Sequence, residues 1–190
     1  MVNRCFVLLS LIVLAGLPPA ARADDKQRGG HEGMESKPGP IHEKLAKLAG
    51  EYTFVTKFRP QPNAEPQETS GTATLSMMLD GRFLREENSG EMLGQKYRGV
   101  RVYGYNSDVK RFEGVWMYTG SVAMMNLVGK SDDEGKSVNW VAEAETANGK
   151  MKLDVITRVV DEDHFVVEMI AKLPNGEKGP AFESTYTRKK

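Results

Sequence analysis

From Gly50 to the C-terminus, apolar or aromatic residues alternate with polar ones in short runs that turn residues separate. Successive side chains of a β-strand point to opposite faces, so this period of two predicts strands that each bury one face. The clearest runs are Tyr52–Phe58, Phe112–Tyr118, Met151–Val155 and Phe165–Ala171. Further runs, which bring the total to about ten strands, lie at 73–79, 82–88, 97–105, 122–129, 137–145 and 181–187.

The connections between these runs are short. Asp80-Gly81, Asn148-Gly149 and Asn175-Gly176 tolerate the positive φ of two-residue hairpin turns, and residues 133–135 suit a slightly longer one. Sequential hairpins make an antiparallel up-and-down meander, and closing it into a barrel removes its exposed edges. The sequence therefore predicts an all-β barrel of about ten strands, formed by residues 41–190 as a single domain. A two-sheet β-sandwich is the alternative, because the pattern does not separate closure from stacking.

A different period precedes the strands. Ile41, Leu45, Leu48 and Ala49 fall on one helical face, with Pro40 at the start and a glycine at position 50 as terminator. This spacing predicts a short N-terminal amphipathic helix of about three turns. Residues 24–40 are polar and rich in glycine and proline, which is typical of a flexible leader.

The first 23 residues have the three parts of a secretory signal peptide. Arg4 supplies a positive charge, residues 5–17 form an apolar run, and Ala21-Arg22-Ala23 is a small-x-small cleavage site. The run is shorter than the roughly 20 residues that span a bilayer, which disfavours an uncleaved anchor. We therefore expect cleavage after Ala23 and export of a soluble chain, periplasmic or secreted, with no integral membrane segment.

Composition narrows the chemistry of the exported chain. Cleavage leaves 167 residues (190 minus 23) and removes the single cysteine, Cys5. The exported chain therefore carries neither a thiol nor a disulfide. Removing Arg4 and Arg22 leaves 24 basic against 26 acidic residues, a net charge of −2. A nucleic-acid partner is not expected, because phosphate binding needs a basic excess on one face.

The three histidines give no sign of a catalytic triad or a metal site. His31 lies in the leader, His42 in the first turn of the helix, and His164 in a turn after three acidic residues. Residues 42–43 lack the second histidine, four residues on, that a zinc-binding helix needs. We expect neither a metal nor a cofactor.

Paired carboxylates can perform acid/base chemistry where they converge. Glu86 and Glu87 are adjacent and diverge across the pleat, whereas Glu143 and Glu145 share a face with Asn139, which is typical of a solvated strand exterior.

Aromatic residues gather on neighbouring hairpins together with Met124 or Met125. Small-molecule sites are mostly apolar, and a barrel of eight or more strands can enclose one ligand. The alternative is that these side chains fill a dry core. The candidates for ligand binding are Tyr103, Trp116, Tyr118, Met124 and Trp140.

The order of motifs from His42 onward resembles the bacterial family called domain of unknown function 1579. The motifs are residues 42–52, Gly81-Arg82-Phe83-Leu84, residues 94–99, Tyr103-Gly104-Tyr105-Asn106, residues 112–116 and the closing Tyr186-Thr187-Arg188. The resemblance implies a lipocalin-like (calycin) barrel and no activity. Tyr52 and Asn106 depart from the family pattern, which usually has Trp and Asp there.

Three functions remain open from the sequence. The first is an extracytoplasmic, non-enzymatic barrel that binds a small, largely apolar ligand. The second is a hydrolase-type enzyme that uses carboxylate and tyrosine groups in the cavity, with Glu86 and Tyr103 as candidates. The third is a packed barrel that serves as a protein-interaction module. Two ionisable side chains in one shared cavity would favour the second, and a barrel without a cavity the third.

Overall fold

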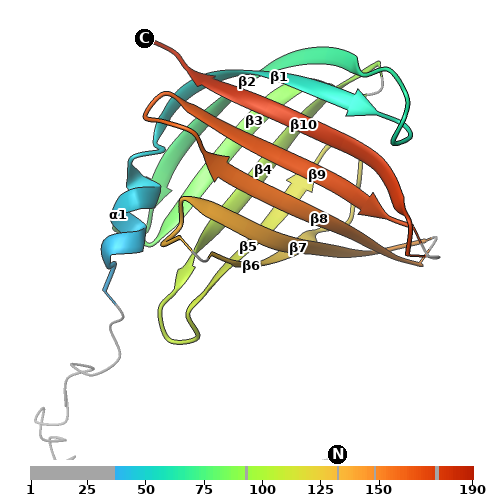
Figure 1. The fold of residues 1–190 in the computed structure, drawn as a ribbon. Coiled ribbons are helices and arrows are strands. Elements are labelled where there is room, and N and C mark those ends of the chain that lie inside the picture. Colours follow the sequence, from blue (N-terminus) through green and yellow to red (C-terminus); the bar gives the residue numbers. More distant parts are fainter. Residues whose placement is uncertain (1–36, 93, 132, 148, 174–175) are drawn as a thin grey trace, which may run out of the picture. The chain divides into compact units, whose positions relative to one another are not determined.

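The computed structural model of the chain describes residues 37–92, 94–131, 133–147, 149–173 and 176–190. The predicted signal peptide and residues 24–36 of the predicted leader, with His31, lie outside the described residues. The described residues form one helix, α1 (Pro40–Ala46), followed by ten strands (Figure 1). The strands are β1 (Gly50–Arg59), β2 (Gln67–Met78), β3 (Phe83–Met92), β4 (Gln95–Asn106), β5 (Arg111–Tyr118), β6 (Met125–Lys130), β7 (Ser137–Thr146), β8 (Gly149–Val159), β9 (His164–Lys172) and β10 (Lys178–Arg188).

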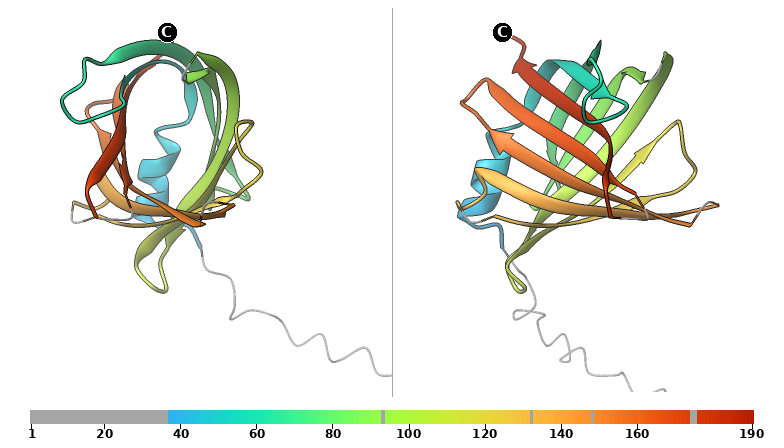
Figure 2. Two further views of the ribbon diagram at one scale, coloured as in Figure 1. Left: turned by 90° about the vertical axis from the view of Figure 1, so that its right-hand side faces the viewer. Right: turned by 45° about the vertical axis from the view of Figure 1, so that its right-hand side comes forward.

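The strands form a closed antiparallel barrel. Each strand pairs with its neighbours in sequence, and β1 closes the ring by pairing with β10 from Tyr52↔Arg188 to Arg59↔Ala181. The left view of Figure 2 looks down the axis of the barrel, with α1 at its far end. The predicted all-β barrel is confirmed, and the alternative of a two-sheet sandwich is wrong because no sheet edge is left open.

Several elements differ in extent from their predictions. Strand β2 begins six residues earlier than predicted, at Gln67, because its polar first half pairs with the end of β1. Strand β6 begins at Met125, three residues later than predicted, and Val122 is fully exposed in the preceding loop. Helix α1 has seven residues, and its last turn tightens through a bond from Leu48 N–H to Leu45 O at 3.0 Å.

Helix α1 lies across one end of the barrel. Leu45 is buried there, and so is His42, whose ring makes a T-shaped contact with Tyr105 at 6.2 Å between ring centroids. His42 Nδ1 accepts a hydrogen bond from Gly39 N–H at 3.0 Å. Buried Leu45 and hydrogen-bonded His42 thus close this end of the barrel, which we call the helix end. The other end, which carries the β1–β2, β5–β6 and β9–β10 connections, is the mouth (Figure 1).

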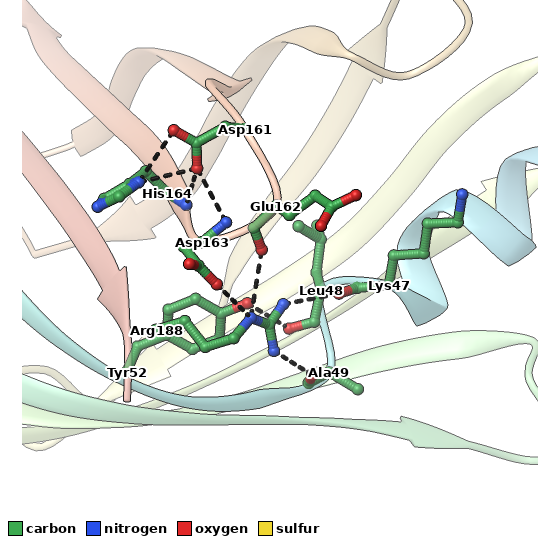
Figure 3. Close-up of polar contacts among 9 residues, drawn as sticks. All are labelled: Lys47, Leu48, Ala49, Tyr52, Asp161, Glu162, Asp163, His164 and Arg188. Carbon is green, nitrogen blue, oxygen red and sulfur yellow. Dashed lines mark hydrogen bonds and ion pairs between the residues drawn. The ribbon is translucent and has the colours of Figure 1, made fainter. Parts of the chain in front are cut away.

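Arg188, at the end of β10, ties the helix end together (Figure 3). Its guanidinium donates to Ala49 O and Lys47 O, both at 2.7 Å, and its Nε donates to Glu162 O at 3.2 Å. It lies 4.8 Å from the ring centroid of Tyr52, whose hydroxyl donates to Leu48 O. One side chain therefore joins the last strand to the segment after α1 and to the β8–β9 turn.

We predict that Arg188→Met lowers the free energy of unfolding by about 1–3 kcal/mol, because it strips donors from three carbonyls at once. Arg158→Met is the matched control, since Arg158 forms an exposed ion pair with Glu168, and its effect should stay within about 0.5 kcal/mol. Urea unfolding followed by tryptophan fluorescence measures both. Equal losses in the two variants would contradict this role for Arg188.

Candidate functional site

The mouth holds a pocket of about 250 Å³ between the inner walls of the barrel. Apolar or aromatic side chains from five strands line it, and polar groups come from Thr56 and Ser184, whose hydroxyls lie 2.7 Å apart, and from residues 67–69 and Glu91. Small-molecule sites combine apolar walls with placed polar groups, and this pocket has both, although its polar share is large. The lining residues are Thr56, Phe58, Gln67, Glu68, Thr69, Glu91, Met92, Gly94, Tyr97, Met169, Phe182 and Ser184.

A carboxylate lies deeper in the barrel than this pocket. Glu86 on β3 has no solvent exposure, and its Oε1 accepts hydrogen bonds from Asn88 Nδ2 at 2.8 Å and from the Tyr186 hydroxyl at 3.0 Å. Tyr186 follows Ser184 by two residues on the same inward face of β10. Ser184, which lines the mouth pocket, and Tyr186, which donates to Glu86, thus lie on one wall, about 7 Å apart along the strand.

Arg101 compensates the buried charge of Glu86. The two residues are directly opposite each other on β3 and β4, and Arg101 Nη1 lies 3.4 Å from Glu86 Oε2. The guanidinium is itself buried and lies 5.9 Å from the ring centroid of Trp116. A buried charge is costly unless it is paired, so each of these two residues needs the other. We call Glu86, Asn88, Arg101 and Tyr186 the polar cluster.

The phenols around the polar cluster stay protonated. Burial, reinforced by the negative charge of Glu86 and opposed by Arg101, raises the pKa of Tyr103 and of Tyr186 well above the ordinary value. Burial and the charge of Glu86, opposed by Arg101, also raise the pKa of Tyr97, which lines the mouth pocket. At neutral pH these hydroxyls therefore act as hydrogen-bond donors and not as phenolate bases or nucleophiles.

Four buried side-chain atoms have no hydrogen-bond partner among the described residues. They are Glu86 Oε2, which contacts Arg101 only as an ion pair, Asn88 Oδ1, Arg101 Nε and Trp116 Nε1. Buried polar groups are nearly always satisfied, so such a group of atoms calls for an explanation.

A family model described as a protein of unknown function (DUF1579) matches residues 37–188. The chain belongs to this family. The resemblance seen in the sequence is thereby confirmed, and so is the lipocalin-like barrel that it implied. No curated protein matches the chain.

Solved structures similar to this DUF1579 chain share its barrel. A phycobiliprotein lyase, CPES from Guillardia theta, matches with a TM-score of 0.55 and 13% identity over 79% of this chain and 93% of its own. The protein Rv2717c from M. tuberculosis matches with a TM-score of 0.56 and 11% identity, covering 81% of this chain and 100% of its own. At such low identity the likeness concerns the fold alone.

The five residues that the sequence predicted to bind a ligand differ in how deeply they are buried. Tyr103, Trp116 and Trp140 are buried in the interior, and half-buried Tyr118 stacks on Trp116 at 4.9 Å between centroids. Met124, however, is 54% exposed. Its placement on the interior surface is corrected, since the inward position belongs to Met125, which is 3% exposed.

None of these five residues lines the mouth pocket, although Trp116 reaches the polar cluster through Arg101. Sequence reasoning had singled out Glu86 but missed Asn88, Arg101 and Tyr186. The signal that finds Asn88 is its spacing of two from Glu86, which puts both side chains on the face of buried Leu84.

The remaining acidic candidates lie outside the barrel. Glu87 points away from Glu86 and pairs with Arg85 at 2.7 Å, as the pleat predicted. Glu143 forms ion pairs with Lys150 and Lys152 on the exterior, also as predicted. Within the described ranges, no group of three or more histidine, cysteine or acidic side chains is arranged to hold a metal ion, and no helix has the length and apolarity to cross a membrane.

A larger groove of about 810 Å³ lies at the helix end, between α1 and the β8–β9 turn. Leu45, Leu48 and Phe112 give it apolar walls, whereas residues 161–163 and Arg188 give it charged ones. Its lining residues already serve the closure of the barrel, whereas the mouth pocket shares the inward face of β10 with Tyr186 of the polar cluster. The mouth pocket is therefore the stronger candidate site despite its smaller volume.

We predict that Glu86→Gln lowers the free energy of unfolding by about 3–5 kcal/mol, because it leaves the Arg101 guanidinium buried and unpaired. Glu87→Gln is the control on the opposite face and should change stability by less than about 0.5 kcal/mol. The double variant Glu86→Leu/Arg101→Met removes both charges and should recover much of the loss. Urea denaturation of all three tests the pair, and a double variant as unstable as Glu86→Gln would contradict it.

Proposed function

We propose that this protein is an exported, non-enzymatic barrel that binds a small, largely apolar molecule, which enters through the mouth. The observation that carries the proposal is the mouth pocket itself, whose wall on β10 continues inward from Ser184 to Tyr186 of the polar cluster. Phe58, Met92 and Phe182 offer apolar contact at the entrance. A molecule that displaces water there gains from burial of its apolar surface.

An enzymatic function remains the second candidate, because Glu86 and Tyr103 lie in one shared interior with Arg101. The surroundings of Glu86 favour binding instead. Its Oε1 already accepts two hydrogen bonds, and the raised pKa of Tyr103 keeps that phenol protonated at neutral pH. A general base needs a free lone pair within reach of its substrate, and such a lone pair remains at Oε2 alone.

The signal peptide predicted in the first 23 residues supports a role outside the cytoplasm. Its cleavage can be tested independently of ligand binding. Expression of the full chain in a bacterium with an active secretory pathway should yield a processed protein whose N-terminus is Asp24. N-terminal sequencing and intact-mass measurement check this cleavage. Ala23→Leu should block processing, because the cleavage site requires a small residue, whereas Ala20→Leu should have a weaker effect. An unprocessed wild-type chain would argue against export.

The environment-sensitive dye N-phenyl-1-naphthylamine tests binding, since its emission rises when it leaves water. We expect it to bind wild-type protein and to bind Ser184→Phe at least about tenfold more weakly, because the new ring fills the mouth pocket. Thr185→Phe is the matched control, since Thr185 is the exposed neighbour on the same strand and its ring points outward.

Thr69→Trp narrows the same pocket from β2 and provides a second blocked variant if Ser184→Phe does not fold. Circular dichroism and thermal unfolding establish that each variant is folded. Equal dye binding by wild-type protein and by both blocked variants would place the dye elsewhere and overturn the proposed entrance.

A further inference from the structure

The inward side chains of β1 and β10 form successive layers from the mouth into the barrel. In the entrance layer, Phe58 is directly opposite Phe182, and their rings stack at 4.7 Å between centroids. In the hydroxyl layer, two residues deeper, Thr56 is opposite Ser184 and their hydroxyl oxygens lie 2.7 Å apart. Both layers line the mouth pocket. A molecule in this pocket therefore meets aromatic rings first and hydroxyl groups about 7 Å further in.

A packed aromatic layer lies beneath the hydroxyl layer. Phe54 is directly opposite Tyr186, at 5.0 Å between ring centroids, and both side chains are buried. The ring of Phe54 also fills the space beside Gly90, since a methyl group on that glycine would lie 3.1 Å from it. Neither of the two rings lines the mouth pocket. The hydroxyl layer is therefore the depth at which a ligand stops.

The hydroxyl layer has hydrogen-bonding capacity left for a ligand. Two hydroxyl groups offer two donors and four acceptor sites, and the bond between Thr56 and Ser184 uses one of each. Tyr97 lines the pocket from β4, and its hydroxyl has no hydrogen-bond partner among the described residues. Because its pKa is raised, this phenol stays a donor at neutral pH. An alcohol or carbonyl oxygen can use these groups.

The lining offers no counter-charge to an ionised ligand. Among the described residues that line the pocket, the charged ones are Glu68 and Glu91, and both are at outward-facing positions of their strands. Lys57 Nζ lies 3.9 Å from Glu68 Oε1, and Lys96 is directly opposite Glu91 on β4. An ion in the pocket would lose hydration without gaining a partner, which is unfavourable.

The volume of the mouth pocket limits the size of its ligand. Pockets for drug-sized molecules measure about 300–1,000 Å³, and this pocket has about 250 Å³. At about 30 Å³ for each water-sized group, it accommodates about eight such groups. A compound with about eight non-hydrogen atoms matches this volume.

We propose that the ligand of the mouth pocket is a small uncharged alcohol or carbonyl compound that enters with its polar end first. Its oxygen binds in the hydroxyl layer, and its apolar end lies in the entrance layer between the walls of β1 and β10. The opposite orientation would leave the remaining donors and acceptors of the hydroxyl layer facing an apolar end. The inference rests on the proposed function, because it concerns the ligand of the same pocket.

Four probes that share a benzene ring test the chemical class. Benzyl alcohol, ethylbenzene, benzylammonium and benzoate are titrated at neutral pH against protein labelled with ¹³C-methyl methionine. The methyl NMR signals of Met92 and Met169, which line the pocket, report binding, and Met117 on the outer face of β5 is the internal control. We expect benzyl alcohol to bind about tenfold or more tightly than either ion, because the ions lose hydration without a counter-charge.

Two variants test the orientation. The double variant Thr56→Val/Ser184→Ala removes both hydroxyl groups at nearly constant volume. It should weaken benzyl alcohol binding by about fivefold or more without weakening ethylbenzene binding, because only the alcohol uses the hydroxyl layer. Tyr97→Phe should act in the same direction and serves if the double variant does not fold. Thr185→Val, which changes the exposed neighbour of Ser184, should bind all four probes as the wild-type protein does.

The results separate this inference from the proposed function. If either ion binds as tightly as benzyl alcohol, the uncharged ligand is wrong, and binding of ethylbenzene and the dye leaves the binding function standing. If the folded variants keep full affinity for benzyl alcohol, or lose affinity for ethylbenzene equally, the orientation is wrong. Absence of binding for all four probes and for N-phenyl-1-naphthylamine overturns both proposals.

Discussion

The antiparallel pairing of β1 with β10 is the interaction on which the interior depends. These strands lie at opposite ends of the folded sequence, and their ladder joins Tyr52 to Arg188. The hydrogen bond from the Tyr186 hydroxyl to Glu86 spans 100 residues and requires that ladder, because Tyr186 is on β10. Arg188 strengthens the same seam from the helix end, where it binds the carbonyls of the segment that leads into β1. Closure therefore creates the site as well as the core.

Closure also explains how a carboxylate persists at the centre of an apolar barrel. Removing a charge from water is unfavourable by several kcal/mol unless ion-pair and hydrogen-bond partners replace its interactions with water. For Glu86 these partners come from three strands: Asn88 on β3, Arg101 on β4 and Tyr186 on β10. Replacing such a pair by apolar side chains is often neutral or stabilising, so stability alone does not account for its presence. The proposed binding function would give the pair a role beyond stability.

The alternation of side chains was enough to predict the ten strands and the direction of Glu86, but not its partners. Glu86 and Asn88 follow Leu84 at a spacing of two, which assigns one face to all three. The position of Arg101 opposite Glu86 depends on the β3–β4 register, and local patterning leaves register open. Met124 shows the same limit, since residues 122–129 carry apolar side chains on both faces and a shift of one residue exchanges Met124 for Met125. A local pattern does not predict contacts between strands that are far apart in the sequence, such as that of Tyr186 with Glu86.

The two halves of the barrel are built for different tasks. Near the helix end, Tyr103, Phe112 and Trp140 pack edge to face at 5.6–5.7 Å between centroids. Toward the mouth, the wall of β2, β3 and β4 instead presents Gly71, Gly90 and Gly99 to the interior, where added side chains would meet Phe54, Asn88 or Trp116. Aromatic packing rigidifies one half, whereas glycines let backbone and polar groups approach closely in the other.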